Sequence, residues 1–114
     1  MQKDLEIRTK RFALAVIDLV SAFPRSLAGD VIGRQLLRSA TSIGANYREA
    51  NRGVSRADFA NKIGTVQKEA SETQYWLELL AESEIIKLES IAGILSEATE
   101  LLAIFTTIGK KLKE

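Results

Sequence analysis

Apolar side chains recur at alternating spacings of four and three residues over much of this chain. The clearest run passes through Phe59, Ile63, Val66, Ala70, Thr73, Leu77 and Leu80. This spacing places side chains on one face of an α-helix, whereas a half-buried strand needs alternation with a period of two. No segment shows such alternation, so the chain can bury its apolar residues only by packing helices against one another.

The same pattern predicts four helices separated by short connections. They run over about residues 3–22, from 28–30 to 53, from 55 to 83 and from 88 to 111. Pro24 ends the first helix, because proline disfavours helical geometry in the residue before it and has no amide hydrogen to donate. Ser55 is placed to cap the third helix, with Asp58 three residues later. Gly53 is placed to end the second helix in the left-handed conformation.

Each predicted helix contributes one apolar stripe to a common core. The stripes of the other three helices comprise Leu5, Phe12, Val16, Leu19 and Phe23, then Leu36, Ala40, Ile43 and Tyr47, and finally Leu88, Ile91, Leu95, Ala98, Leu102, Phe105 and Gly109. Small residues surround Gly44 and should let a neighbouring element approach closely. Short connections make neighbouring helices antiparallel. We therefore predict an all-α fold in which residues 1–114 form a single antiparallel up-down four-helix bundle.

The composition argues against most catalytic chemistry. The chain has no Cys and no His, which removes disulfides, cysteine nucleophiles, Ser-His-Asp triads and the Glu-x-x-His ligands of di-iron bundles. Glu49, Glu69 and Glu72 could point inward, so a carboxylate-only metal site is a remote alternative. We predict a protein that is not an enzyme and that uses no cofactor.

The chain is expected in the cytoplasm. No apolar run approaches the ~18 residues of a membrane span, and the first residues mix charges instead of forming the apolar stretch of a signal peptide. The absence of Cys fits a reducing compartment.

Charge is distributed unevenly along a chain whose net charge is only +1. Residues 31–56 hold five Arg and one Glu, whereas residues 57–100 hold three Lys and nine acids. At ~100° per residue, Arg34, Arg38, Arg48 and Arg52 fall within an arc of about 80° on the second helix, opposite its apolar stripe. We call these four residues the arginine stripe.

The arginine stripe spans about 27 Å at the rise of an α-helix and could follow a nucleic-acid backbone. Arg56 and Lys62, at the start of the third helix, could extend it. The alternative is a solvated or salt-bridged face in which acids of the third helix, Glu69, Glu72 and Glu78, pair with the arginines.

The fourth helix carries more apolar surface than one core requires. Ile94, Leu101, Ile104 and Ile108 widen its apolar arc to roughly 200°, and Ala13, Ile17 and Val20 do the same for the first helix. Either both helices are deeply buried, or part of this surface is a subunit interface. We favour an oligomer, with Ile94, Leu101, Ile104, Ile108 and Trp76 as candidate interface residues.

Polar and aromatic residues on the second and third helices form a further group. Asn46, Tyr47, Gln74, Tyr75 and Trp76 could build a hydrogen-bonded cluster that fixes the register of these helices. A ligand pocket is the less favoured interpretation of the same residues.

Three segments carry a family resemblance: residues 33–50, with the sequence GRQLLRSATSIGANYREA, residues 55–59, with SRADF, and residues 69–77, with EASETQYWL. They resemble the four-helix bundle proteins encoded within intervening sequences of bacterial 23S ribosomal RNA genes, also called S23-type proteins. The resemblance covers nearly the whole chain and is most specific from residue 33 to residue 80.

The resemblance implies a bacterial up-down bundle that assembles as a ring-shaped homopentamer, in a family whose biochemical role is unsettled. The accessory variability determinants of diversity-generating retroelements are similar in fold and assembly, are basic, bind nucleic acid and associate with a reverse transcriptase. Two functions follow. One is an oligomeric bundle that binds RNA or DNA through the arginine stripe, and the other is a protein-interaction scaffold similar to those accessory subunits.

Overall fold

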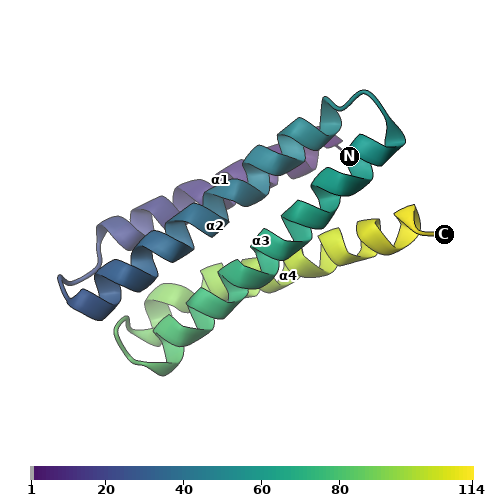
Figure 1. Cartoon of the computed structure of the whole chain (residues 1–114). Helices are drawn as coiled ribbons and strands as arrows, with labels where there is room; N and C mark the ends of the chain where they lie inside the picture. The colour runs from purple at the N-terminus through teal and green to yellow at the C-terminus, as the bar shows by residue number, and fades with distance from the viewer. Residues whose placement is uncertain (1) are drawn as a thin grey trace.

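The computed structural model describes residues 2–114, and the side chains from residue 4 onward. These residues fold into four α-helices, α1 (Gln2–Ser21), α2 (Leu27–Asn51), α3 (Arg56–Glu82) and α4 (Leu88–Leu112) (Figure 1). The observed bounds lie within a few residues of those predicted from the apolar spacing. The all-α fold is confirmed.

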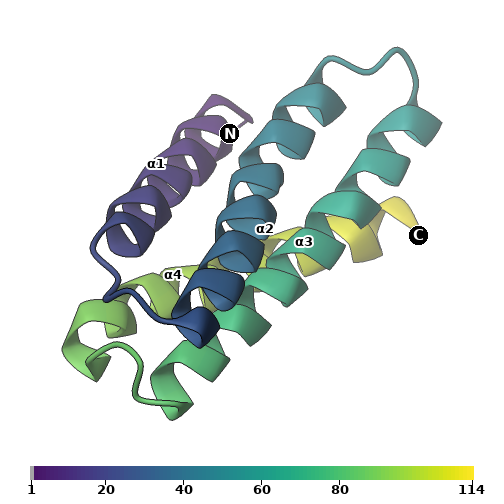
Figure 2. The same cartoon turned by 60° about the vertical axis from the view of Figure 1, so that its left-hand side comes forward.

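The helices follow one another up and down along a bundle that measures 44 × 22 × 21 Å. Each helix packs on the next one in the chain, and α1 also meets α4, but along a much shorter line of contact. In both Figure 1 and Figure 2, α2 and α3 run side by side, and the start of α1 lies apart from the end of α4. The bundle is therefore closed most tightly around α2 and α3 and most loosely between α1 and α4.

Serine side chains begin the two central helices. The Ser26 hydroxyl accepts a hydrogen bond from the amide of Gly29 at 3.0 Å, and the Ser55 hydroxyl accepts one from the amide of Asp58 at 3.1 Å. The cap predicted at Ser55 is thus confirmed, whereas the cap at Ser26 was missed. Each bond satisfies a helix-terminal amide that has no partner within its own helix.

The prediction that Gly53 adopts the left-handed conformation is wrong. No positive φ occurs at this glycine, and Arg52 caps α2 instead, with φ −107° and ψ 7°. A Cβ atom added to Gly53 would lie 3.2 Å from the Ala50 carbonyl oxygen and 3.2 Å from the Asp58 Cβ atom. Glycine is needed at residue 53 because the end of α2 packs closely on the start of α3, and not because the backbone has a positive φ.

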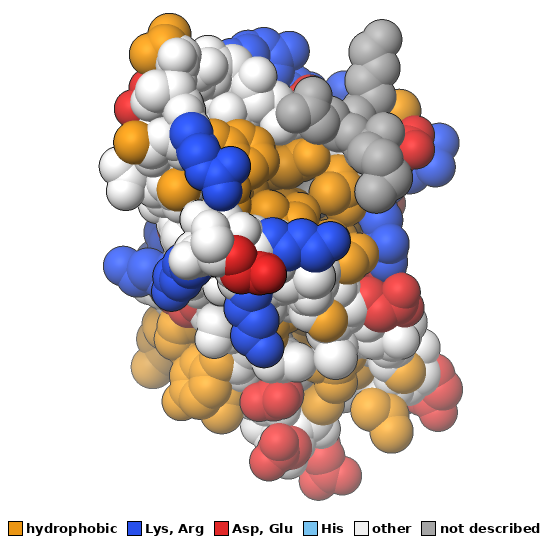
Figure 3. All heavy atoms as spheres, turned by 90° about the vertical axis from the view of Figure 1, so that its right-hand side faces the viewer, with side chains coloured by type: hydrophobic (Ala, Val, Ile, Leu, Met, Phe, Trp, Pro, Cys, Tyr) orange, Lys and Arg blue, Asp and Glu red, His pale blue; other side chains and the backbone are white. Residues whose placement is uncertain are grey.

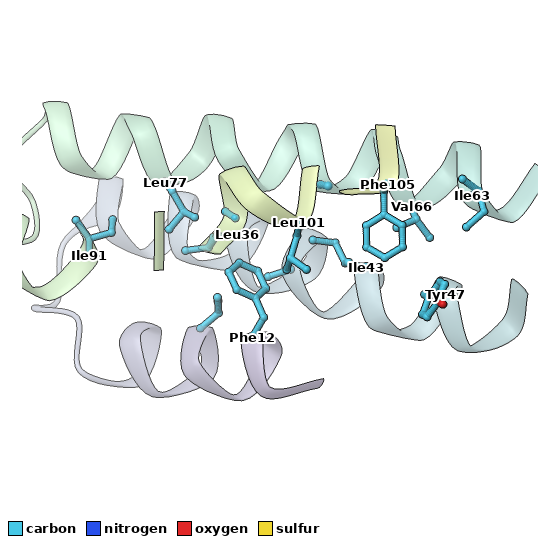
Figure 4. Packing of buried hydrophobic residues seen from close by; sticks show 14 of the residues in the cluster. Phe12, Leu36, Ile43, Tyr47, Ile63, Val66, Leu77, Ile91, Leu101 and Phe105 are labelled. Carbon is cyan, nitrogen blue, oxygen red and sulfur yellow. The ribbon is translucent and has the colours of Figure 1, made fainter. Parts of the chain in front are cut away.

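The core comes from the predicted stripes of all four helices, and Figure 4 shows its central residues. Phe12 enters from α1, Leu36 and Ile43 from α2, and the rings of Tyr47 and Phe105 pack edge to face with centroids 5.2 Å apart. Burial raises the pKa of the Tyr47 phenol. Apolar burial of this kind is the main force that holds the bundle together.

The core face of α4 differs from the prediction at two leucines. Leu88 is 62% exposed, because it is the first residue of α4 and lies before the helix enters the bundle. Leu101, which we expected beside the core stripe, is fully buried within it. The buried face of α4 therefore runs through Ile91, Ala98, Leu101 and Phe105.

Gly44 lies where α1 and α2 approach closely, as the small residues around it predicted. A Cβ atom at this position would lie 3.1 Å from the Thr9 Oγ1 atom and 3.5 Å from the Thr9 carbonyl carbon. Thr9 is itself fully buried, and its hydroxyl donates to the Leu5 carbonyl at 2.8 Å. The absence of a side chain at residue 44 is what lets Thr9 pack against α2.

The predicted polar cluster around Trp76 does not form as a single unit. Trp76 Nε1 donates to Glu72 within α3, and Gln74 Nε2 donates to Thr99 Oγ1 on α4 at 3.0 Å. The buried polar link between α2 and α3 is instead the Thr73 hydroxyl donating to the Ser39 hydroxyl at 2.8 Å. Both hydroxyls are completely buried, so this pair helps to fix the register of the two helices.

Candidate nucleic-acid interface

The arginine stripe lies on the outer side of α2. This helix is continuous for 25 residues and carries Arg34, Arg38 and Arg48, while Arg52 is the C-cap residue that directly follows it. Each is exposed, while Leu36, Ile43 and Tyr47 on the opposite side are buried. The positions agree with the predicted angular spacing, but the surroundings of the four side chains differ.

Arg38 is held by two acids of α3. Its guanidinium group donates to Glu69 Oε1 at 3.3 Å and also to Glu72. Loss of hydration lowers the pKa of Arg38, but the two carboxylates outweigh this effect and raise the pKa above its ordinary value. Pairing with α3 was the alternative to nucleic-acid contact, and it holds for this residue.

Arg48 and Arg52 share one acid of α1. Each lies 3.7 Å from Glu6 Oε1, while the other oxygen of Glu6 accepts a hydrogen bond from Asn51 Nδ2 at 2.9 Å. The Glu6 side chain is only 21% exposed, so its position is fixed. One carboxylate faces two guanidinium groups, and this part of the stripe keeps an excess of positive charge.

Arg34 forms no ion pair with the described side chains, those of residues 4–114. Arg56 donates to the Leu112 carbonyl at 3.3 Å and so keeps its charge, whereas Lys62 lies 3.3 Å from Glu49. The stripe thus divides into a neutralised centre at Arg38, a free cation at Arg34 and a partly neutralised segment at Arg48 and Arg52.

A groove of about 440 Å³ runs beside the stripe between α1 and α2. It is lined by small residues, among them Ala13, Gly44 and Ala45, and by charged residues of both signs, Glu6, Lys10, Arg48 and Glu49. The groove brings Lys10 next to the arginine stripe, which the sequence analysis missed. Its proximity follows from the contact between Thr9 and Gly44 and could not be found in the spacing of either helix alone.

A second groove of about 870 Å³ separates the first half of α1 from the first half of α4. Arg8 crosses it, donating to Glu97 through Nε at 2.7 Å and through Nη2 at 2.8 Å, and also to Glu100 at 3.0 Å. The hydrogen bond to Glu97 raises the pKa of Arg8. This ion pair joins the two helices at the loosest side of the bundle.

The carboxylates considered for a metal site do not come together. Glu49 is 64% exposed and faces Lys62, while Glu69 and Glu72 face Arg38 on the outside of the bundle. The expectation that Glu49 could point inward is wrong, because its position on α2 lies on the solvent side next to Arg48. Among the described residues, no group of three or more acids is placed to hold a metal ion.

The candidate interface residues are split between core and surface. Leu101 is fully buried within the single chain, so its assignment to a subunit interface is wrong. Ile94, Ile104, Ile108 and Trp76 are half-buried and keep part of their side chains at the surface. They stay candidates.

The exposed apolar surface of α1 includes Ile17, which was expected beside the core stripe, and also Ile7 and Leu14, which were not. Ile7 is 49% exposed, Leu14 52% and Ile17 39%. Their spacings of seven and three place Ile7 and Leu14 on the side opposite the core, with Ile17 beside them. That spacing was visible in the sequence, but Phe12 and Val16 dominate the same helix.

Of the helices in the described part of the chain, α4 alone is long and apolar enough to cross a membrane. Glu97 and Glu100 interrupt its apolar sequence near the middle, and both accept hydrogen bonds from Arg8 of α1. A helix in the core of a soluble bundle can have the same length and apolar composition as a membrane-spanning helix. Here Ile91, Ala98, Leu101 and Phe105 of α4 are packed in the bundle core.

Comparisons with known proteins agree with the fold and with the sequence motifs. The family model described as 23S rRNA-intervening sequence protein matches residues 3–107. The chain is also similar to the crystal structure of a protein with unknown function from the S23 ribosomal protein family of Bacteroides thetaiotaomicron. The two chains are 40% identical with a TM-score of 0.86, over 96% of this chain and 99% of the other. Comparison with curated proteins finds no match.

Proposed function

This chain belongs to the family of 23S rRNA-intervening sequence proteins, and we propose that it is a non-enzymatic, homo-oligomeric bundle that binds RNA or DNA in the cytoplasm. The binding surface includes the arginine stripe together with Arg56 and Lys62. Five copies form the assembly that the family resemblance implies.

The unequal neutralisation of the stripe is the observation that carries this proposal. Arg34 has no acidic partner in the described part of the chain, and Arg48 and Arg52 share Glu6 alone. Guanidinium groups held on a rigid helix can each contact phosphate through two hydrogen bonds. Such contacts position a nucleic-acid backbone and do not read its sequence.

Assembly would favour nucleic-acid binding, because it repeats the arginine stripe once in each copy. A single stripe carries little net charge, but copies arranged in one oligomer bind a long polyanion with an effective concentration far above that of free sites. The exposed apolar side chains of α1 and the half-buried side chains of α4 and Trp76 supply surface for contacts between copies.

The alternative function is a protein-interaction scaffold, similar to the accessory subunits of diversity-generating retroelements. The ion pairs of Arg38 with Glu69 and Glu72 favour it, because arginines held by α3 are less available to phosphate. In this case a protein partner docks on the assembly, and the arginines of α2 serve the stability of the bundle.

Fluorescence anisotropy at increasing salt separates the two functions. The protein is titrated against structured ribosomal RNA and duplex DNA, beside an Arg34→Glu/Arg48→Glu variant whose assembly is checked by light scattering. We expect log K for duplex DNA to fall with log salt with a slope of about −0.9 for each phosphate contact. The variant should assemble normally and bind at least tenfold more weakly.

Absence of binding by the assembled wild-type protein in low salt would refute nucleic-acid binding for these ligands. Binding that is unaffected by salt, or that is retained in the variant, would remove the arginine stripe from the interface.

A further inference from the structure

One end of the bundle collects basic residues from segments that are far apart in the sequence. Here α2 ends, α3 begins and α4 ends, as Figure 1 shows. Arg52 and Arg56 lie in and beside the connection from α2 to α3, while Lys110, Lys111 and Lys113 lie at the end of α4. We call these five residues the basic end.

A direct contact joins the two segments. Arg56 Nη2 donates to the carbonyl oxygen of Leu112 at 3.3 Å. Leu112 lies between Lys111 and Lys113 in the chain, so the start of α3 is fixed beside the lysines of α4. Figure 3 views the molecule from this end, where Lys and Arg side chains surround an apolar area.

Arg52 belongs both to the basic end and to the arginine stripe and lies 3.7 Å from Glu6 Oε1. The other four cations of the basic end are more available than most of the stripe. Lys110, Lys111 and Lys113 are exposed and form no ion pair with the side chains of residues 4–114. Arg56 binds a carbonyl oxygen and not an acid. In the stripe, by contrast, Arg38 faces two carboxylates.

Helix polarity accounts for part of this composition, because lysines in the last turn offset the partial negative charge of α4 carbonyl groups. Helix polarity does not explain why Arg52 and Arg56, from the α2–α3 connection and the start of α3, lie beside these lysines. Asp58 and Glu114 lie near the same end, as do Asp4 and Glu6 at the start of α1, and Glu6 is 3.7 Å from Arg52. The five cations of the basic end therefore face four acids. The opposite end carries the exposed acids Glu82, Glu84 and Glu89, which repel a polyanion.

We propose that the basic end is a principal contact surface for a nucleic-acid backbone, with Arg56, Lys111 and Lys113 binding phosphates. This inference rests on the proposed function and assigns the α4 lysines to it. Flexible lysines on a helix end act as point charges, so the contact is to backbone phosphates without selection of base sequence.

Three variants of the full-length protein, each lacking two positive charges, test the assignment. Lys111→Gln/Lys113→Gln changes the basic end, Arg34→Gln/Arg48→Gln changes the stripe, and Arg25→Gln/Lys87→Gln changes the connections at the opposite end. Circular dichroism and light scattering verify that each variant folds and assembles. Anisotropy then gives the affinity for a duplex DNA of fixed length at several salt concentrations.

We expect the basic-end variant to bind at least fivefold more weakly, with a salt slope reduced by about one for each lost phosphate contact. The opposite-end variant should match wild type. If the basic-end variant and the opposite-end variant bound DNA equally weakly, the proposal would be overturned, because the affinity would then depend on net charge alone. Loss of binding in the stripe variant only would overturn it while leaving the proposed function intact.

Two further results would refute both proposals. One is the absence of DNA and RNA binding by the wild-type protein. The other is binding to vesicles containing phosphatidylglycerol without any binding to nucleic acid, which would assign the same cations to an anionic membrane surface.

Discussion

Arg34 and Arg38 lie four residues apart on α2, yet their electrostatic surroundings differ greatly. Arg38 leans towards α3 and meets Glu69 and Glu72, whereas Arg34 meets no acid within the described residues. Helical periodicity predicted that both would be exposed, which is correct. It could not show which arginine has an acidic partner, because that depends on the rotation and register of α3 against α2.

Gly44 gives a prediction at the residue scale. Gly44→Leu should destabilise the bundle by about 1–3 kcal/mol, because the new side chain must displace Thr9 of α1 from a close contact. Urea denaturation followed by circular dichroism measures the change.

Gly64→Ala is the matched control for this effect. A Cβ atom at residue 64 meets nothing within 4 Å, so alanine should stabilise α3 by up to about 1 kcal/mol through its higher helix propensity. Equal stability of the wild type and Gly44→Leu would show that α1 does not pack closely on α2.

At the scale of the element, α1 is the helix held least firmly. Only Thr9, Phe12 and Val16 are fully buried among its described side chains, and the groove beside α4 leaves one of its flanks open. Arg8 closes this side through its two-bond contact with Glu97. Local opening should therefore begin with α1, since regions with few buried contacts open at lower free energy.

Arg8→Ala should lower the stability of α1 by about 1 kcal/mol, the upper range for a partly exposed ion pair. Native-state hydrogen exchange should show α1 amides exchanging about fivefold faster, with α2 and α3 little changed. Arg11→Ala provides the control, because Arg11 is exposed on the same helix and forms no ion pair with any side chain from residue 4 onward. Identical exchange in the two variants would contradict a tethering role for Arg8.

For the whole molecule, the exposed apolar face of α1 bears on assembly. Ile7, Leu14 and Ile17 are all at least 39% exposed on one helix that contributes few residues to the core. A charge on this face should cost more when it must be buried between copies than when it remains in water.

Leu14→Lys should therefore shift the proposed oligomer to monomer at micromolar concentration without unfolding it. Light scattering measures the mass, and Val54→Lys, at a 93% exposed residue of the α2–α3 connection, is expected to assemble like wild type. An unchanged mass for Leu14→Lys would direct the search to Ile94, Ile104 and Ile108 on α4. A monomeric wild-type protein would contradict the assembly itself.

The sequence by itself determined the four helices, most of the core, the cap at Ser55 and the outward position of the arginines. These features depend on local spacing, because a helix fixes the direction of each side chain relative to its neighbours. It misplaced Leu88, Leu101, Glu49 and the backbone of Gly53, where an element end or a contact with another helix decides the outcome.

Only the tertiary structure decided which arginines are paired, how Thr9 meets Gly44 and that Arg56 joins the lysines of α4. Each of these contacts links residues more than 30 positions apart. Their formation depends on the register and tilt between helices, which the spacing within a single helix does not contain.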